Sequence, residues 1–157
     1  MREALGLVIV VLCVCTSQIP LASAQPPHLD YLQHCAGCHK EDGSGSLSNE
    51  IPDMRGLIGH FARDSDGRAF LVQVAGVSQA PLPSRSLAAL LNWTLYQFSP
   101  EELPDNFLPY TAFEVENLRK NRPANLPAAR RKIAENLAKL GFSIENYPTG
   151  KQIDENY

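Results

Sequence analysis

Five consecutive residues carry the clearest chemical pattern in the sequence. Cys35 and Cys38 are separated by the small residues Ala36 and Gly37, and His39 follows directly. This C-x-x-C-H spacing is that of covalent haem attachment, because two thiols three positions apart can each bond one vinyl group at one edge of a porphyrin. The next imidazole can then bind the iron. We therefore expect one haem c on Cys35 and Cys38, with His39 as the proximal iron ligand.

Two other kinds of site use a cysteine pair at this spacing. A zinc knuckle needs four ligands and usually a second cysteine pair, whereas the chain after residue 24 contains only Cys35 and Cys38. A thioredoxin-like redox pair normally lies where a strand leads into a helix, but no strand-like alternation precedes Cys35. Haem attachment is therefore the preferred interpretation.

The N-terminus has the pattern of a secretory signal peptide. Arg2 precedes an apolar run over residues 5–14, and Ala-Ser-Ala at 22–24 provides the small residues of a cleavage site. A membrane-spanning helix needs about 20 apolar residues, roughly twice this run, so we expect cleavage and no stable membrane anchor. Cleavage removes Cys13 and Cys15. These features predict export to the periplasm and a signal peptide over residues 1–24.

The charge of the chain argues against one class of function. The formal net charge is −3, and loss of Arg2 and Glu3 with the signal peptide leaves it unchanged. A nucleic-acid-binding protein would need a net positive surface, so no nucleic-acid partner is expected. Basic residues gather at 119–139 and acidic residues at 41–66. They form either solvated helix surface or a face that docks a partner.

Apolar residues recur at helical spacing, and no segment alternates like a strand. Thr111-Ala112-Phe113-Glu114 has the pattern of a capping box, which predicts a helix start, and Gly141 predicts a helix end. The fold class is therefore expected to be all-α. The predicted helical segments are 30–40, 52–61, 68–77, 84–98, 111–119 and 127–140. Asp64, Ser65, Asp66 and Gly67 are expected to form a turn before the third of them.

The sequence resembles the class I cytochrome c family over roughly residues 28–98. The resemblance rests on the Cys-Ala-Gly-Cys-His motif, on Gly-Ser-Gly at 43–45, on Ile-Pro-Asp-Met-Arg-Gly at 51–56, and on the closing helix at 87–93. It implies a small cytochrome c fold around a covalent haem. The closing helix would pack across the motif helix, with residues 25–98 as the cytochrome c domain and 99–157 as a helical C-terminal extension with a polar tail.

The resemblance also assigns a role to Pro52. In this family the carbonyl of the proline that follows the glycine loop accepts the free ring N–H of the proximal histidine. For this chain it implies that Pro52 fixes the tautomer and the orientation of His39.

The sixth iron ligand is where the chain departs from the family. Most members supply a methionine from the loop before the last helix, whereas residues 76–83 contain none. Met54, close behind Pro52, is expected in the core rather than on the iron. His60 is the next candidate, because neutral imidazole binds iron well. Otherwise the distal site is open or weakly occupied, with Ser78, Gln79 or water nearby.

These observations favour single-electron transfer between extracytoplasmic redox proteins, with a periplasmic dehydrogenase as the expected donor. A first alternative is a binding protein that holds a diatomic gas or small anion at an open distal site. A second is a peroxidase-type enzyme, with Arg68 or Arg85 as the cationic donor. His60 is its one candidate distal base, so we expect a carrier rather than an enzyme.

The extension over residues 99–157 has two interpretations. Its two amphipathic segments either pack on the core or cover a haem edge and bind a redox partner. The first is the simpler, because each segment has an apolar face that needs burial.

Overall fold

The computed structural model describes residues 25–144, so the predicted signal peptide and most of the polar tail lie outside the described residues. Within this range the chain is helical, apart from loops and one isolated antiparallel bridge between Ser46 and Ile51. The prediction of an all-α fold is confirmed. The elements are α1 Pro27–His34, α2 Ala36–His39, the 3-10 turn η1 Leu47–Asn49, α3 Ile58–Phe61, α4 Ser65–Gln73, α5 Ala75–Ser78, α6 Ser84–Phe98, α7 Ala112–Lys120 and α8 Leu126–Lys139.

Two predicted helices are each divided in the structure. The segment 30–40 becomes α1 and α2, which are separated at Cys35 with φ −124° and ψ −39°. The segment 68–77 becomes α4 and α5, because Val74 is extended with ψ 145°. Helix α4 also begins earlier than predicted. The Asp64 carboxylate accepts a hydrogen bond from the Gly67 amide at 2.8 Å and so caps a helix start that the sequence analysis had interpreted as a turn.

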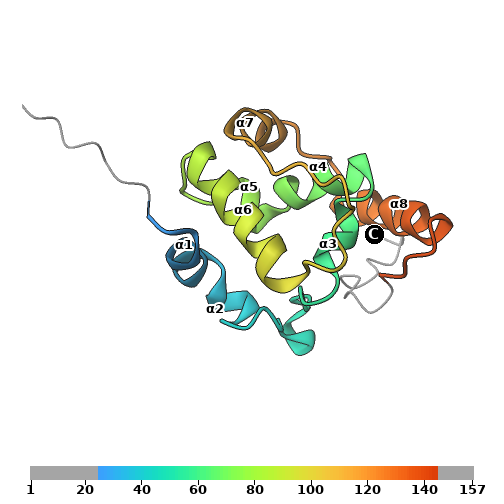
Figure 1. Cartoon of the computed structure of the whole chain (residues 1–157), viewed down its shortest axis with the longest axis horizontal. Coiled ribbons are helices and arrows are strands. Elements are labelled where there is room, and N and C mark those ends of the chain that lie inside the picture. The colour runs from blue at the N-terminus through green and yellow to red at the C-terminus, as the bar shows by residue number, and fades with distance from the viewer. Residues whose placement is uncertain (1–24, 145–157) are drawn as a thin grey trace, which may run out of the picture.

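Helix α6 is the central element of the fold (Figure 1). Its buried face packs against α1 on one side and α7 on the other. Three aromatic rings lie at the contact with α1: Tyr31 is 5.2 Å from both Trp93 and Phe98, and Trp93 is 5.7 Å from Phe98. Aromatic pairs at these distances stabilise the fold by more than the burial of their surface area alone. The three rings therefore fix how α1 crosses α6.

The helix ends of the extension follow their local sequence. The Thr111 hydroxyl accepts a hydrogen bond from the Glu114 amide at 3.1 Å, which confirms the predicted cap of α7. Gly141 has φ +86° after α8, and the amides of Gly141 and Phe142 bond to carbonyls of the last helical turn at 3.0 Å. This left-handed ending confirms the predicted stop.

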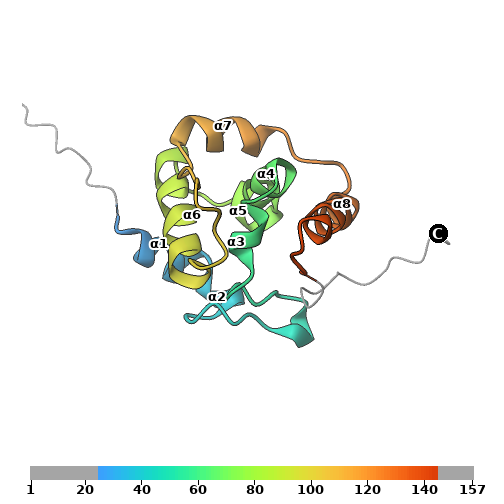
Figure 2. The same cartoon turned by 45° about the vertical axis from the view of Figure 1, so that its right-hand side comes forward.

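The two helices of the extension lie on different parts of the body. Helix α7 crosses α6 and α4, whereas α8 lies against α4 and α3 at the end of the molecule far from α1 (Figure 2). None of the described helices is long and apolar enough to cross a membrane.

Two apolar clusters form the described interior. The motif-side cluster, against which Cys35 and Ala36 also pack, consists of Tyr31, Met54, Ile58, Val72, Ala80, Leu87, Ala88, Leu90, Leu91, Leu95, Phe98, Leu103, Tyr110 and Val115. The α8 cluster consists of Phe61, Phe70, Ile133, Leu137 and Ile144. Because Leu103, Tyr110 and Val115 belong to the motif-side cluster, α7 and the segment before it share one core with α1 and α6.

Candidate haem-attachment site

The five motif residues lie on one tight turn after α1. The amides of Cys38 and His39 both donate to the carbonyl of Cys35, at 3.1 Å and 2.9 Å. Cys35 is half-buried and Cys38 is exposed, and both are free thiols. A single turn therefore carries two free thiols and the imidazole that follows them.

The Cys35 thiol is held in its protonated form. Burial raises its pKa to about 11, and the carboxylate of Asp30 and the thiol of Cys38 add to this effect. Catalytic redox pairs instead have a thiol with a lowered pKa, which makes the thiolate available. The environment of Cys35 is therefore unlike that of a thioredoxin-like pair.

The His39 ring is half-buried, and its pKa is lowered mainly by that burial. The backbone carbonyl of Pro52 acts in the opposite direction, because it favours a proton on the ring. Nδ1 is buried and has no hydrogen-bond partner among the described residues. The imidazole is thus neutral near pH 7 and has Pro52 as its polar neighbour, which is the state in which a histidine binds a metal.

A glycine loop brings Pro52 back to the motif. The Gly45 amide donates to the His39 carbonyl at 3.0 Å, and Gly45 has φ +63°. A Cβ there would collide with the carbonyl oxygens of Ile51 and Pro52. Only glycine combines this backbone angle with so close an approach, so Gly45 allows the chain to return beside His39.

Hydrogen bonds hold this loop to the two helices that flank it. The Tyr31 hydroxyl donates to the Lys40 carbonyl at 2.6 Å, the Met54 amide to the Gly43 carbonyl at 2.9 Å, and the Gly56 amide to the Phe98 carbonyl at 2.8 Å. Burial raises the pKa of Tyr31, so its hydroxyl stays protonated as a donor. The local sequence does not predict this anchor, although Tyr31 lies one helical turn before Cys35.

The two side chains considered for the sixth ligand are both occupied elsewhere. Met54 is 7% exposed and belongs to the motif-side cluster, where the sequence analysis expected it. The His60 ring packs against the ring of Phe142 in the extension, with centroids 4.9 Å apart and the planes tilted by 33°. Burial is the main cause that lowers the pKa of His60, with Glu102 opposing it and Arg63 adding to it. His60 therefore lies at the interface with the segment after α8.

The loop between α5 and α6 contains a buried polar group. The Ser78 hydroxyl is buried, and no described residue hydrogen-bonds to it. Arg119 from α7 donates to the backbone carbonyl of Ser78 itself and to that of Ala80. The place of Ser78 near the distal site stays a prediction, and nothing in the local sequence distinguishes Arg119 from the other basic residues of 119–139.

Arg68 and Arg85, the two arginines considered as cationic donors for a peroxidase-type site, differ in their surroundings. Arg68 forms two hydrogen bonds with Glu114, at 2.6 and 2.8 Å, and its guanidinium lies 4.0 Å from the centre of the Tyr110 ring. Tyr110 in turn donates to the Arg68 carbonyl at 2.7 Å. Arg85 is exposed near the start of α6. Arg68 thus joins α4 to α7 rather than standing free as a donor to a ligand.

A cleft of about 700 Å³ opens between the α3–α4 region and the extension. Its lining includes Arg63, Arg68, Phe107, Glu114 and Phe142, and none of the motif residues. Among residues 25–144, no group of three or more His, Cys, Asp or Glu side chains is placed to share a metal ion.

Comparisons with known proteins give one distant relationship. A cytochrome c-552 of Thermus thermophilus is 28% identical over 133 aligned residues, which cover 72% of this chain and 89% of the relative. A second Thermus thermophilus cytochrome c-552 is 28% identical over 119 residues, or 63% of this chain and 90% of that protein. The chain is distantly similar to cytochromes c-552. No family model and no solved structure matches it.

This similarity supports a c-type cytochrome. The first match covers 72% of this chain, which is more than the segment 28–98 on which the resemblance rested.

Proposed function

We propose that the protein is an extracytoplasmic single-electron carrier with one haem c. Cys35 and Cys38 hold the haem through thioethers, and His39 is the proximal iron ligand. The observation that carries the proposal is the C-x-x-C-H turn, whose neutral, half-buried imidazole lies beside the Pro52 carbonyl. The distant similarity to cytochromes c-552 supports the same function.

The residues of the C-x-x-C-H turn fit a covalently attached haem. Attachment needs two reduced thiols, and both cysteines are free. Ligation needs a neutral imidazole, and a proton on Nδ1 that faces the Pro52 carbonyl leaves Nε2 free for iron. The buried Nδ1 is the polar atom that such a tautomer would satisfy. When bound, the haem supplies the one-electron couple that no side chain of the motif provides.

The surrounding chain supports electron transfer by staying rigid and apolar. The loop after the motif is held to α1 through Lys40 and to α6 through Gly56, and the Met54 amide joins it internally to Gly43. The Tyr31, Trp93 and Phe98 rings close the contact of those helices. A site that changes little in shape favours electron exchange, and low polarity around the haem adjusts its potential.

The proposal includes the route of the chain and its partners. Residues 1–24 direct export to the periplasm and are removed, residues 25–98 form the cytochrome c domain, and 99–157 form its extension. A redox protein, with a periplasmic dehydrogenase as the first candidate, supplies the electrons. No nucleic acid and no stable membrane anchor take part.

Covalent attachment provides the direct test. The purified protein should keep its haem through acid organic extraction, and mass spectrometry should find one haem on a chain that begins at Gln25. The Cys35→Ala, Cys38→Ala double variant should yield no holoprotein, whereas Met54→Leu, as matched control, should yield it normally. A haem-free wild-type protein that binds zinc would overturn the proposal.

A second candidate function is binding of a small ligand such as a diatomic gas. It is favoured by the buried Ser78 hydroxyl, a polar group in a loop that contains no methionine. An open site predicts a high-spin fraction in the ferric protein and carbon monoxide binding by the ferrous protein without denaturant. A fully low-spin protein that rejects carbon monoxide would exclude this function, and His60→Ala would then test whether His60 binds the iron.

A further inference from the structure

One arginine of the extension binds three backbone carbonyls of the loop before α6. From Arg119 on α7, Nε donates to the Ser78 carbonyl at 3.0 Å, Nη2 to the Ala80 carbonyl at 2.6 Å, and Nη1 to the Leu82 carbonyl at 2.8 Å. All three guanidinium nitrogens thus donate hydrogen bonds to one short segment, residues 78–82. The five donors of a guanidinium have a fixed planar arrangement, so three converging carbonyls specify its place closely.

The loop needs such a donor because of its own sequence. Pro81 and Pro83 have no amide hydrogen and cannot close a turn by donating to a neighbour. The Ala80 carbonyl also accepts from the Leu82 amide at 2.8 Å, whereas no backbone amide of the described residues donates to the carbonyls of Ser78 and Leu82. Carbonyls that the backbone leaves unpaired need another donor. Arg119, which is half-buried, is that donor.

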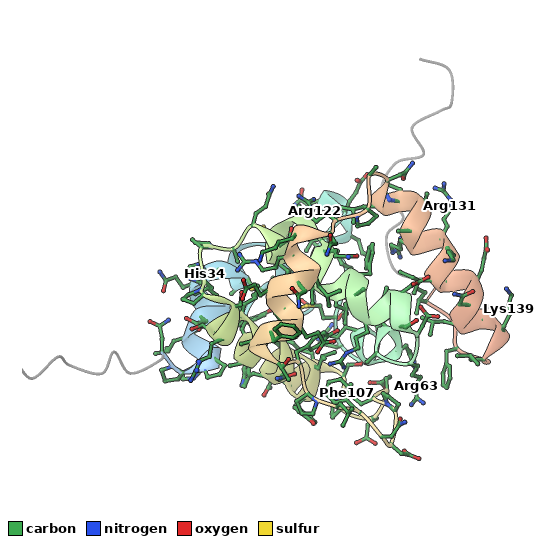
Figure 3. All side chains as sticks on the ribbon, turned by 90° about the horizontal axis from the view of Figure 1, so that it is seen from above. His34, Arg63, Phe107, Arg122, Arg131 and Lys139 are labelled. Carbon is green, nitrogen blue, oxygen red and sulfur yellow. The ribbon has the colours of Figure 1, made fainter. Side chains whose placement is uncertain are left out.

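A second contact fixes the same end of α7 to the chain just before α5. The Arg122 guanidinium donates to the Gln73 carbonyl at 3.0 Å, and the Gln73 amide group donates to the Asn121 carbonyl at 2.6 Å. The bond from Arg122 lies outside the loop, and Arg122 itself lies just beyond the end of α7 (Figure 3). The end of α7 therefore holds the chain on both sides of α5, and of these two arginines Arg119 is the one that reaches the loop.

The loop and the cysteine motif face the same interior. Ala80 belongs to the motif-side cluster, and Val77 and Leu82 pack against it, as do Cys35 and Ala36 on the motif side. The Ser78 hydroxyl is buried in this loop. A porphyrin bonded to the motif would therefore share its apolar surroundings with the segment that Arg119 binds.

We infer that Arg119 holds the loop 78–82 closed over the interior beside the haem and thereby limits the access of small ligands to the iron. Arg119 is a positioning residue, because it acts through the loop and does not itself touch the iron. The inference rests on the proposed function for the haem, whereas the closure of the loop is a property of the polypeptide.

Hydrogen exchange tests the closure in the ferric holoprotein. In Arg119→Gln, the amides of residues 77–80 and of Leu82 should exchange at least about tenfold faster, because three hydrogen bonds from a charged donor are lost. Arg122→Gln should raise exchange near residue 73 and leave the loop largely unchanged. Arg131→Gln, at an exposed position on α8, should change neither. Equal exchange in Arg119→Gln and Arg131→Gln would overturn the inference.

Binding of added imidazole to the ferric iron tests access in the same variants. Arg119→Gln should bind it about tenfold faster than the wild-type protein, with Arg131→Gln at the wild-type rate. Faster exchange with an unchanged binding rate would overturn the control of access. If Arg119→Gln does not fold, Arg119→Lys keeps the charge without the fork and should give intermediate rates, and wild-type rates would overturn the inference.

The haem content of the wild-type protein separates the two proposals. If that protein carries no haem, the proposed function fails, while the exchange comparison still decides whether Arg119 closes the loop. If it carries one haem and the loop exchanges alike in all variants, only the inference about Arg119 fails.

Discussion

The two helices of the extension are attached to the body in different ways. Helix α7 places Val115, which is 0% exposed, in the motif-side cluster, and it is joined to α4 and to the loop before α6 by Glu114 and Arg119. Helix α8 places Ile133 and Leu137 in the α8 cluster. Two of its polar contacts reach α4 and the Asp64 cap: Lys132 donates to Asp66 at 2.7 Å in an exposed bond, and Asn136 to Asp64 at 3.2 Å in a partly buried one.

This difference indicates which changes reach the haem motif. A substitution among the residues on which α7 packs affects the motif-side cluster, against which Cys35 packs. It also affects the loop before α6, which belongs to the same cluster. A change under α8 acts on Phe61 and Phe70, in a separate cluster. We therefore expect α7 to influence the haem and α8 to contribute mainly stability.

The basic segment at 119–139 divides along the same line. Arg119 and Arg122 donate hydrogen bonds to backbone carbonyls, whereas Arg131 and Lys139 are exposed on α8. Figure 3 shows these two residues far from His34, which lies on α1 beside the motif. A partner that docks on the basic residues of α8 would therefore not lie against the motif turn.

The largest predicted effect compares matched leucines in the two clusters. Leu95→Ala and Leu137→Ala each remove a fully buried side chain, and each should lower the free energy of unfolding by about 2–5 kcal/mol. Only Leu95→Ala, one helical turn from Phe98, should also shift the visible haem spectrum. Chemical denaturation and absorption spectra provide the test, and an equal spectral change in Leu137→Ala would break the comparison.

The next prediction compares the coupling free energies of two ion pairs, one that joins α7 to α4 and one that joins α8 to α4. Arg68 and Glu114 are partly buried, with side-chain exposures of 20% and 29%, and a double-mutant cycle with Arg68→Met and Glu114→Gln should give a coupling of about 0.5–3 kcal/mol. The Lys132 and Asp66 side chains are 68% and 52% exposed. Their cycle should give about 1 kcal/mol or less, and a coupling as large as the first would contradict the proposed difference.

A smaller effect tests the motif-side cluster at Met54. Met54→Leu keeps the volume of a buried side chain, so it should cost less than about 1.5 kcal/mol of stability. The visible and near-infrared spectra of the ferric protein should stay unchanged, because Met54 packs in the core. Loss of a charge-transfer band at the red end of the spectrum would instead identify Met54 as an iron ligand.

The smallest effect is a pH dependence at the α8 side. The folded-state pKa of His60 is lowered from 6.5, so the unfolded chain binds this proton more readily than the folded one. Stability from His60 is therefore fully present above about pH 6.5 and is lost as the pH falls toward the lower folded-state pKa. His60→Gln should flatten the unfolding free energy in this interval. Parallel curves for the variant and the wild-type holoprotein would contradict the prediction.

Local sequence predicted the parts of the molecule that depend on neighbouring residues. The C-x-x-C-H turn, the Thr111 cap, the stop at Gly141 and the apolar face of α6 all depend on spacings within a few turns of chain. The same local reasoning failed at Asp64, where a turn signal proved to be a helix cap. Asp caps helices and begins turns with the same side-chain oxygen, so the sequence does not separate the two.

The tertiary structure decided what lies far apart in sequence. It brought His60 against Phe142, Arg68 against Glu114, and Arg119 against the carbonyl of Ser78. The chain's own residues therefore specified the haem motif and the helical class of the fold. The roles of the arginines and the division of the extension into two kinds of contact depend on how helices pack, because a side chain's partner is set by which elements meet and not by its neighbours in the sequence.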